Sequence, residues 1–215
     1  MQPADLHPTK TPALLFDLDG TLLDSFPAHF RAYMAMFARY NIAVTEASFY
    51  ALYSPNWLET YRRVGLPEEL WEEADEVWME EALKHQPELF PGAREALDWL
   101  GARYRLGLVT SGSKDRVYGD LTRSGIHDRF EVIVTGGDVQ HPKPHPQGLH
   151  LALAGLGLPA AGAVYIGDAL ADYETARAAG MRFIGIPSRF ASLKPETPCP
   201  QVRDLAALLE LFGAA

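Results

Sequence analysis

The stretch LLFDLDGTLLDS, residues 14–25, joins an apolar run directly to two carboxylates, Asp17 and Asp19, that lie one residue apart. Asp and Gly are ordinary turn formers at a strand end, so a turn accounts for one carboxylate and for Gly20. It does not account for the second carboxylate, because two negative charges this close repel each other. A reason for the pair has to come from the rest of the chain.

Four further short runs are continuously apolar in their interior, as is the run before Asp17, rather than apolar at alternate positions. Continuous apolarity is typical of strands that are covered on both faces. The runs predict buried parallel strands over 13–17, 105–110, 131–135, 163–168 and 182–187. Helical patterns separate or follow the last four runs, over 92–102, 114–124, 146–156, 169–179 and 202–211. This alternation predicts an α/β fold with a doubly wound parallel sheet.

About 60 residues after Ser25 interrupt the alternation, because they show helical patterns and no convincing strand. The two clearest patterns are FPAHFRAYMAMFARY and PEELWEEADEVWMEEALKH. We predict an inserted helical cap at 26–87 and a core composed of 1–25 and 88–215. Three tryptophans are expected in the interior of this cap: Trp57, Trp71 and Trp78.

Charge and cysteine usage exclude several classes of protein. A net charge of -9 argues against a general nucleic-acid or anionic-membrane surface, since both need an excess of Lys and Arg. The single cysteine, Cys199, excludes an internal disulfide and suits a reducing cytosol. The N-terminal MQPADLHPTKTP lacks the apolar segment of a signal peptide, and no apolar run approaches the ~20 residues of a membrane span. We therefore expect a cytoplasmic protein, either a monomer or a homodimer.

Polar groups recur at the carboxyl ends of the first four predicted strands or in the loops that follow them. In an open α/β sheet, ligands bind in the crevice outside these ends. One such group alone is weak evidence, but four at one edge of the sheet predict a site. Its candidate residues are Asp17, Asp19, Thr110, Ser111, Lys143, Asp168 and Asp172.

The chemistry of this site follows from its charge. Several carboxylates in one cleft require a cation, and oxygen ligands suit a hard ion such as Mg²⁺, which commonly binds phosphate as well. Lys143 supplies a fixed positive charge, and Thr110 and Ser111 supply donors for phosphate oxygens. One carboxylate can then attack phosphorus, while a second one protonates the leaving oxygen and later deprotonates water. Both Asp17 and Asp19 then have a function.

The motifs DLDGT (17–21), the hydroxyl pair after the second strand, KPHP (143–146) and GDALAD (167–172) resemble those of the haloacid dehalogenase-like (HAD) hydrolase superfamily. The resemblance runs from about residue 13 to 212. The inserted segment is similar to the C1 cap of the phosphoglycolate phosphatase and β-phosphoglucomutase-like subfamily. The family's core is a Rossmann-like sheet of five strands in the order 5-4-1-2-3, which the resemblance implies here.

The resemblance also implies a role for each site residue. Asp17 would be the nucleophile and Asp19 the general acid/base. Mg²⁺ would be held by the side chains of Asp17 and Asp168 and by the backbone carbonyl of Asp19, while Asp172 would support the metal or orient Lys143. The phosphoryl group would be held by Thr110, Ser111 and Lys143.

We therefore predict a Mg²⁺-dependent phosphatase that hydrolyses a small phosphate monoester such as phosphoglycolate through an aspartyl-phosphate intermediate. A β-phosphoglucomutase-like phosphomutase would keep the same core motifs, but such relatives carry a phosphate-binding arginine near the place of Asn56. Arg62 and Arg63 of the cap are candidates for contacting a second anionic group of the substrate. A non-catalytic phospho-accepting or binding protein is a further alternative. It is less favoured, because a receiver domain has no such cap and an inactive relative would be expected to lack Asp19 or Lys143.

Overall fold

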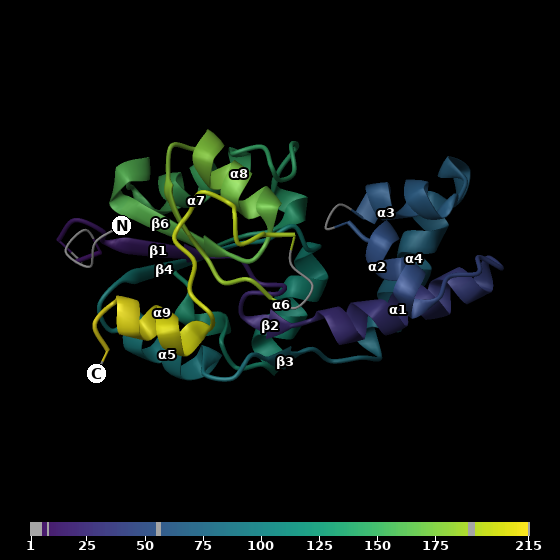
Figure 1. Cartoon of the computed structure of the whole chain (residues 1–215), viewed down its shortest axis with the longest axis horizontal. Helices are drawn as coiled ribbons and strands as arrows, with labels where there is room; N and C mark the ends of the chain where they lie inside the picture. Colours follow the sequence, from purple (N-terminus) through teal and green to yellow (C-terminus); the bar gives the residue numbers. More distant parts are fainter. Residues whose placement is uncertain (1–5, 8, 55–56, 189–191, 215) are drawn as a thin grey trace. The chain divides into compact units, whose positions relative to one another are not determined.

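The computed structural model of the chain describes residues 6–7, 9–54, 57–188 and 192–214. The chain forms two compact units (Figure 1). One comprises Met1–Asp24 and Glu88–Ala215, and the other comprises Ser25–Pro87. Each unit is described by itself below.

The first unit is built on a parallel sheet of five strands. These strands are β1 (Ala13–Phe16), β4 (Arg105–Val109), β5 (Val132–Val134), β6 (Ala163–Gly167) and β7 (Arg182–Gly185). Their order across the sheet is β5-β4-β1-β6-β7, and every neighbouring pair is parallel. Numbered along the chain, this is the predicted order 5-4-1-2-3, which is thereby confirmed. β1 lies at the centre because its four residues are all buried and can pair on both sides.

Helices cover both faces of this sheet (Figure 1). Successive residues of a strand point to opposite faces, so Leu14 and Phe16 join one apolar cluster while Ala13 and Leu15 join the other. The first cluster contains side chains from α5 (Ala93–Gly101), α6 (Lys114–Arg123) and α9 (Leu205–Leu211). The second contains side chains from α7 (Gln147–Leu156) and α8 (Leu170–Ala178). Coverage on both sides explains why the strands read as unbroken apolar runs.

Each strand of this sheet ends one or two residues before its predicted end, and the polar residues that close the first four predicted runs lie just outside their strands. The sheet still holds these residues by their backbone. The N–H of Asp17 donates to the Ile166 carbonyl at 2.8 Å, and the N–H of Thr110 donates to the Val134 carbonyl at 3.0 Å. The main chain at the edge is therefore fixed while the side chain leaves the apolar layer.

A short antiparallel ribbon, which the sequence analysis did not identify, pairs β2 (Leu23–Asp24) with β3 (Glu88–Leu89). Its strands join the two segments of the first unit at the positions where the second unit is inserted. Strands of two residues are too short to show any periodicity, so no sequence pattern indicated them.

The second unit consists of helices among its described residues: α1 (Phe26–Arg39), α2 (Glu46–Leu52), α3 (Trp57–Val64), a 3₁₀ turn (Glu68–Leu70) and α4 (Trp71–Leu83). Its interior is largely aromatic, and Trp71 and Trp78 pack against it as predicted. The prediction was wrong for Trp57, which is 38% exposed and contacts the ring of Tyr61 edge-on.

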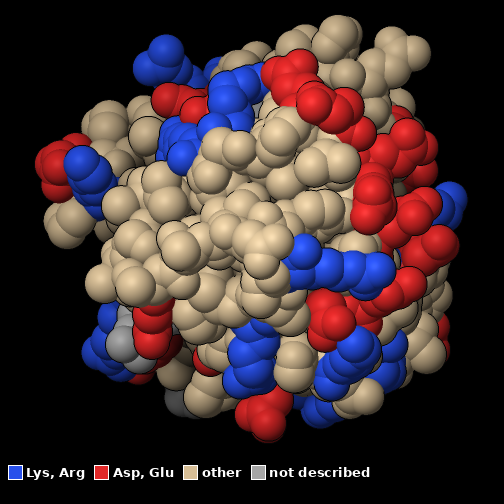
Figure 2. Space-filling view, turned by 90° about the vertical axis from the view of Figure 1, so that its right-hand side faces the viewer, with Lys and Arg blue, Asp and Glu red and all other residues tan. Residues whose placement is uncertain are grey.

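The surface of this helical unit is acidic along α4. Glu72, Glu73, Glu76 and Glu80 are exposed there, and Figure 2 shows acidic side chains gathered along one side of the face it presents. No helix in the described part of the chain combines the length and apolar character needed to cross a membrane.

Candidate active site

The loop after β1 brings the DLDGT motif against the end of β6. The backbone N–H groups of Leu22 and Leu23 donate to the Leu18 carbonyl, and that of Gly20 donates to the Leu23 carbonyl, which closes a tight loop. Gly20 has φ = 84°, a conformation that side chains disfavour. A Cβ atom at this position would lie 2.2 Å from Oδ2 of Asp168. Glycine at position 20 therefore permits the loop to lie directly against the carboxylate of Asp168.

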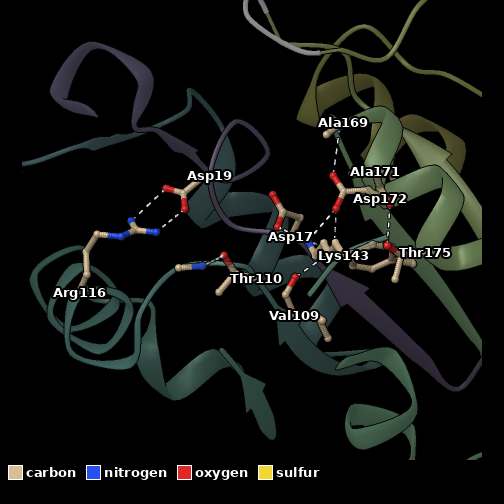
Figure 3. Close-up of polar contacts among 12 residues, drawn as sticks. Asp17, Asp19, Val109, Thr110, Arg116, Lys143, Ala169, Ala171, Asp172 and Thr175 are labelled. Atoms are coloured by element: carbon tan, nitrogen blue, oxygen red, sulfur yellow. Dashed lines mark hydrogen bonds and ion pairs between the residues drawn. The ribbon is translucent and has the colours of Figure 1, made fainter. Parts of the chain in front are cut away.

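Lys143 is the centre of a buried polar cluster at this edge of the sheet (Figure 3). Its Nζ donates to Oδ1 of Asp17 at 2.6 Å and to Oδ1 of Asp172 at 2.7 Å. It also lies 2.5 Å from the hydroxyl of Tyr165. Since the Lys143 side chain is only 11% exposed, these contacts replace most of the water around the ammonium group.

Asp172 is held by protein donors on both of its oxygens. Oδ2 accepts from the backbone N–H of Ala169 at 3.0 Å, and Oδ1 faces both Lys143 and the Tyr165 hydroxyl, the latter at 3.0 Å. Its place depends on Gly167, where a Cβ atom would lie 2.6 Å from Oδ2. Asp172 therefore contacts Lys143 directly, and whether it orients Lys143 or supports a metal stays a prediction.

Tyr165 is a member of the cluster that the sequence analysis missed. Its hydroxyl also lies 2.9 Å from the Val109 carbonyl, so it links β6 to β4 beneath Lys143. In the sequence it is one residue of an apolar strand, AVYIG. A single hydroxyl in such a run was the only available signal, and it is too common to single out.

Three buried carboxylates of this cluster could hold a metal ion. One oxygen each from Asp17, Asp168 and Asp172 lies within 4.8 Å of the others. Ser188, which the sequence analysis also missed, donates its hydroxyl to Oδ2 of Asp168 at 2.7 Å. Closely spaced carboxylate oxygens are the donors that hard divalent cations prefer, so the residues present fit such an ion.

The charges in this cluster are out of balance without a further cation. Burial raises the pKa of Asp17 to about 7; Lys143 opposes this increase, and Asp172 adds to it. Burial also raises the pKa of Asp168 well above its ordinary value, and the charges of Asp172 and Asp17 add to it. Burial alone would lower the pKa of Lys143, but Asp17 and Asp172 together raise it. A divalent cation would favour the ionised carboxylates and release the protons that burial retains.

The carboxylate of Asp19 points away from this cluster, toward a second cation (Figure 3). Arg116, in the first turn of α6, places Nη1 3.1 Å from Oδ1 and Nη2 2.5 Å from Oδ2. Asp120, one turn further along the helix, accepts from Nη1 of Arg116 at 3.1 Å. The sequence analysis missed Arg116, because an arginine and an aspartate four residues apart are an ordinary helix-surface pair.

The predicted phosphate-binding residues surround one small cavity. Thr110, Ser111 and Lys143 all line it. Thr110 is buried, and its Oγ1 accepts from the N–H of Gly112 at 3.3 Å, whereas Ser111 is exposed. The loop after β4 and Lys143 therefore border the same cavity at the edge of the sheet.

The cap residues predicted from the sequence to contact the substrate lie in the second unit. Arg62 and Arg63 lie on α3, where Glu59 accepts from Arg62 Nη1 at 3.0 Å and from Arg63 Nε at 2.9 Å. Asn56 lies outside the described residues. A role for these three residues in binding the substrate stays a prediction.

Comparison with known proteins agrees with this geometry. Residues 14–186 match the family described as haloacid dehalogenase-like hydrolase. A phosphoglycolate phosphatase of Nitrosococcus oceani is 31% identical over 183 residues, covering 80% of this chain and 81% of that protein. The pyrophosphatase PpaX of Bacillus velezensis is 32% identical over 185 residues, covering 82% and 83%. The crystal structure of CbbY from Rhodobacter sphaeroides in complex with phosphate has a TM-score of 0.79 and 25% identity, covering 92% of this chain and 96% of that one.

The chain belongs to the haloacid dehalogenase-like hydrolase family. Within that family it is an enzyme that hydrolyses phosphate esters, as predicted, since phosphoglycolate phosphatases are among its relatives.

Proposed function

We propose that this enzyme is a Mg²⁺-dependent phosphatase of small, soluble phosphate monoesters and that it acts through a phosphorylated Asp17. The observation that carries the proposal is the Lys143 cluster. It combines three buried carboxylates, an ammonium group and hydroxyl donors at the carboxyl edge of a parallel sheet. Such an edge is where open α/β sheets bind their ligands.

The first step of the reaction uses Asp17 as the nucleophile. Its carboxylate lies at the end of the central strand, where the last ladder hydrogen bond fixes its backbone. Attack on phosphorus forms an acyl phosphate on Asp17 and breaks the bond to the leaving oxygen. Lys143 and the donors around Thr110 and Ser111 would hold the phosphoryl oxygens, where positive charge stabilises the transition state.

A magnesium ion at this edge would be held by Asp17, Asp168 and the backbone carbonyl of Asp19. When bound, it would neutralise charge on the phosphoryl group and on the carboxylates themselves. Asp172 is less suited to be a direct ligand, because both of its oxygens already face protein donors. Its function would be to keep Lys143 in place.

The second carboxylate of the motif would move the protons. Asp19 would donate a proton to the leaving oxygen in the first step and accept one from the attacking water in the second. Its side chain is 26% exposed, so a substrate and a water molecule can approach it. This division of labour gives each aspartate of DLDGT a separate reason to be present.

The substrate class rests on charge and on relatives. The net charge of -9 disfavours polyanionic substrates, and a cap of about 60 residues favours compact ones. The phosphoglycolate phosphatase among the relatives makes 2-phosphoglycolate the first compound to test. Pyrophosphate is the second, because of the relative named pyrophosphatase PpaX. These names also favour hydrolysis over the phosphomutase alternative.

The deciding experiment measures kcat/KM for 2-phosphoglycolate, pyrophosphate, sugar phosphates and nucleotides. Each compound is assayed with Mg²⁺, with EDTA and with Ca²⁺, beside a mutase assay on β-glucose 1-phosphate. We expect phosphate release that EDTA abolishes, Mg²⁺ restores and Ca²⁺ supports poorly, since Ca²⁺ does not enforce compact octahedral geometry. Formation of glucose 6-phosphate without phosphate release would replace the phosphatase with the mutase. Full activity after exhaustive chelation would remove the metal from the proposal.

A further inference from the structure

We propose that Arg116 is a positioning residue for Asp19: it sets the direction of the carboxylate that acts as the general acid/base. This inference rests on the function proposed above for Asp19. It assigns a role in the reaction to a residue that none of the four sequence motifs contains.

The two carboxylates of the DLDGT motif are held by two different cations. Asp17 faces Lys143, whereas Asp19 faces Arg116 (Figure 3). Both terminal nitrogens of Arg116 contact Asp19, one per oxygen, at 3.1 and 2.5 Å. A forked contact of this kind fixes the plane and the direction of a carboxylate, which a single-point ammonium contact cannot do.

Arg116 is itself held in a prepared position. Its side chain is 7% exposed, and Asp120, 3% exposed, accepts from it on the helix side. Asp120 in turn pairs with Arg123 one turn later. The guanidinium group also needs a glycine beside it, because a Cβ atom at position 112 would lie 2.1 Å from Nη2 of Arg116. The segment SGSKDR therefore supplies both the arginine and the space that it occupies.

Stability alone is a weak reason for this arrangement. Burying charged groups costs desolvation free energy that an ion pair often does no more than offset, and apolar residues of similar size commonly serve a helix interior as well or better. The chain Asp19–Arg116–Asp120–Arg123 instead extends from a rigid helix to the one carboxylate whose direction matters for proton transfer. Each oxygen of Asp19 can accept more than one hydrogen bond, so Arg116 can hold the direction of the carboxylate while one oxygen also faces the leaving group.

The test compares two esters whose leaving groups differ in their need for a proton. Arg116→Met keeps an unbranched side-chain stem but removes the charge and the fork. We expect kcat/KM to fall by about 10- to 100-fold for the alkyl ester 2-phosphoglycolate, since a misdirected catalytic group loses about this much. For 4-nitrophenyl phosphate, whose leaving group needs no proton, the loss should stay within a few-fold. Asp19→Ala should show the same preference with larger losses.

A double-mutant cycle separates this role from a merely structural one. If Arg116 acts through Asp19, Asp19→Ala/Arg116→Met should hydrolyse 2-phosphoglycolate within about twofold of Asp19→Ala alone. The matched control is Arg123→Gln, which removes an ion pair to the same Asp120 without touching Asp19. It should affect both esters equally and only slightly. Equal losses on both esters for Arg116→Met, or losses that add to those of Asp19→Ala, would overturn the proposal.

One further variant and one further measurement keep the test decisive. If Arg116→Met does not fold because Asp120 loses one of its two partners, Arg116→Lys carries the same comparison, since a lysine keeps the charge but not the fork. If the wild-type enzyme hydrolyses neither ester, the proposed function fails. In that case, crystal structures of the wild type and of Arg116→Lys show directly whether Arg116 sets the direction of the Asp19 side chain. An unchanged Asp19 side-chain direction in the variant would refute it.

Discussion

The carboxyl edge of the sheet buries charges, whereas the interior of the helical unit buries aromatic rings. Asp17 and Asp168 are each 6% exposed and Asp172 is 2% exposed, which is nearly as buried as Phe49 and Tyr61 at 0%. Burial of ring surface lowers the free energy of folding, while burial of a carboxylate raises it unless a partner compensates. Similar burial therefore has different explanations: the charged cluster is retained for chemistry, and the aromatic cluster for stability.

The raised pKa values at the sheet edge express this cost. Carboxylates placed for stability commonly have a lowered pKa, because a partner favours their charged form. Asp17 and Asp168 shift the other way, since burial and their like-charged neighbours outweigh Lys143. Strongly shifted groups gathered in one place are typical of a functional site.

The largest expected effect removes a charge from the edge. Asp17→Asn should lower kcat by at least about four orders of magnitude, because an amide cannot form the acyl phosphate. The melting temperature should stay level or rise, since the amide does not repel Asp168 and Asp172. Steady-state kinetics and thermal unfolding measure the two outcomes. Asp24→Asn, later in the same stretch and outside the cluster, is the control and should retain activity. Comparable activity in Asp17→Asn and the wild type would end the nucleophile assignment.

A large truncation in the aromatic cluster should have the opposite effect: it should lower the stability of the protein. The Phe49 ring packs, at centroid distances of 5.2–6.3 Å, against Phe26, Phe30, Tyr33, Phe37 and Tyr53. Phe49→Ala should therefore reduce the free energy of unfolding by about 3–5 kcal/mol. Denaturant unfolding measures this loss, and Phe49→Leu, which leaves a smaller void, should lose less. A loss below about 1 kcal/mol for the alanine variant would show that the rings do not form a tight core.

A subtler pair of changes tests how well the same cluster is built. The Tyr61 hydroxyl is buried with no hydrogen-bond partner among the described residues, whereas Nε1 of Trp71 donates to the Leu66 carbonyl at 2.9 Å. Removing an unpaired buried hydroxyl relieves a desolvation cost, so Tyr61→Phe should stabilise the protein by about 1 kcal/mol. Trp71→Phe should destabilise it by at least a similar amount, because the Leu66 carbonyl loses this donor. Chemical denaturation of both variants checks the signs, and equal signs would contradict this difference.

The smallest expected effect comes from an exposed carboxylate, and it can be compared with the effects of the buried carboxylates. Asp204 caps α9 through a hydrogen bond from the Ala207 N–H to Oδ1 at 2.8 Å, and this bond lowers the pKa of Asp204. Asp204→Ala should cost about 0.5–1 kcal/mol at neutral pH. A carboxyl group whose pKa is lower in the folded state stabilises the protein at any pH above its pKa in the unfolded state. This stabilisation is lost as the pH falls through the pKa of the folded state. The difference between wild type and variant should thus shrink below about pH 4 in pH-dependent unfolding. A difference that does not depend on pH would attribute the effect to helix propensity instead.

Much of the fold was readable from local patterns. Five unbroken apolar runs predicted the five parallel strands, because a strand covered on both faces must be apolar on both. The motif residues came from the same reading, since polar groups at the ends of such strands share one edge. The strand order, by contrast, came from the family resemblance. The ribbon of β2 and β3 was not predicted, because strands of two residues are too short to show a periodic pattern.

What surrounds each motif residue could not be predicted in this way. Asp19 and Arg116 are 97 residues apart in the chain, and Lys143 and Asp17 are 126 apart. Local sequence patterns report on neighbours within a few residues, whereas these pairs form only when the sheet brings distant loops to one edge. Aspartates at 17 and 19 could therefore be identified from their own motif. The separate cation that each carboxylate faces was determined by the tertiary structure alone, because that choice depends on side-chain directions and on the space left at Gly20 and Gly112.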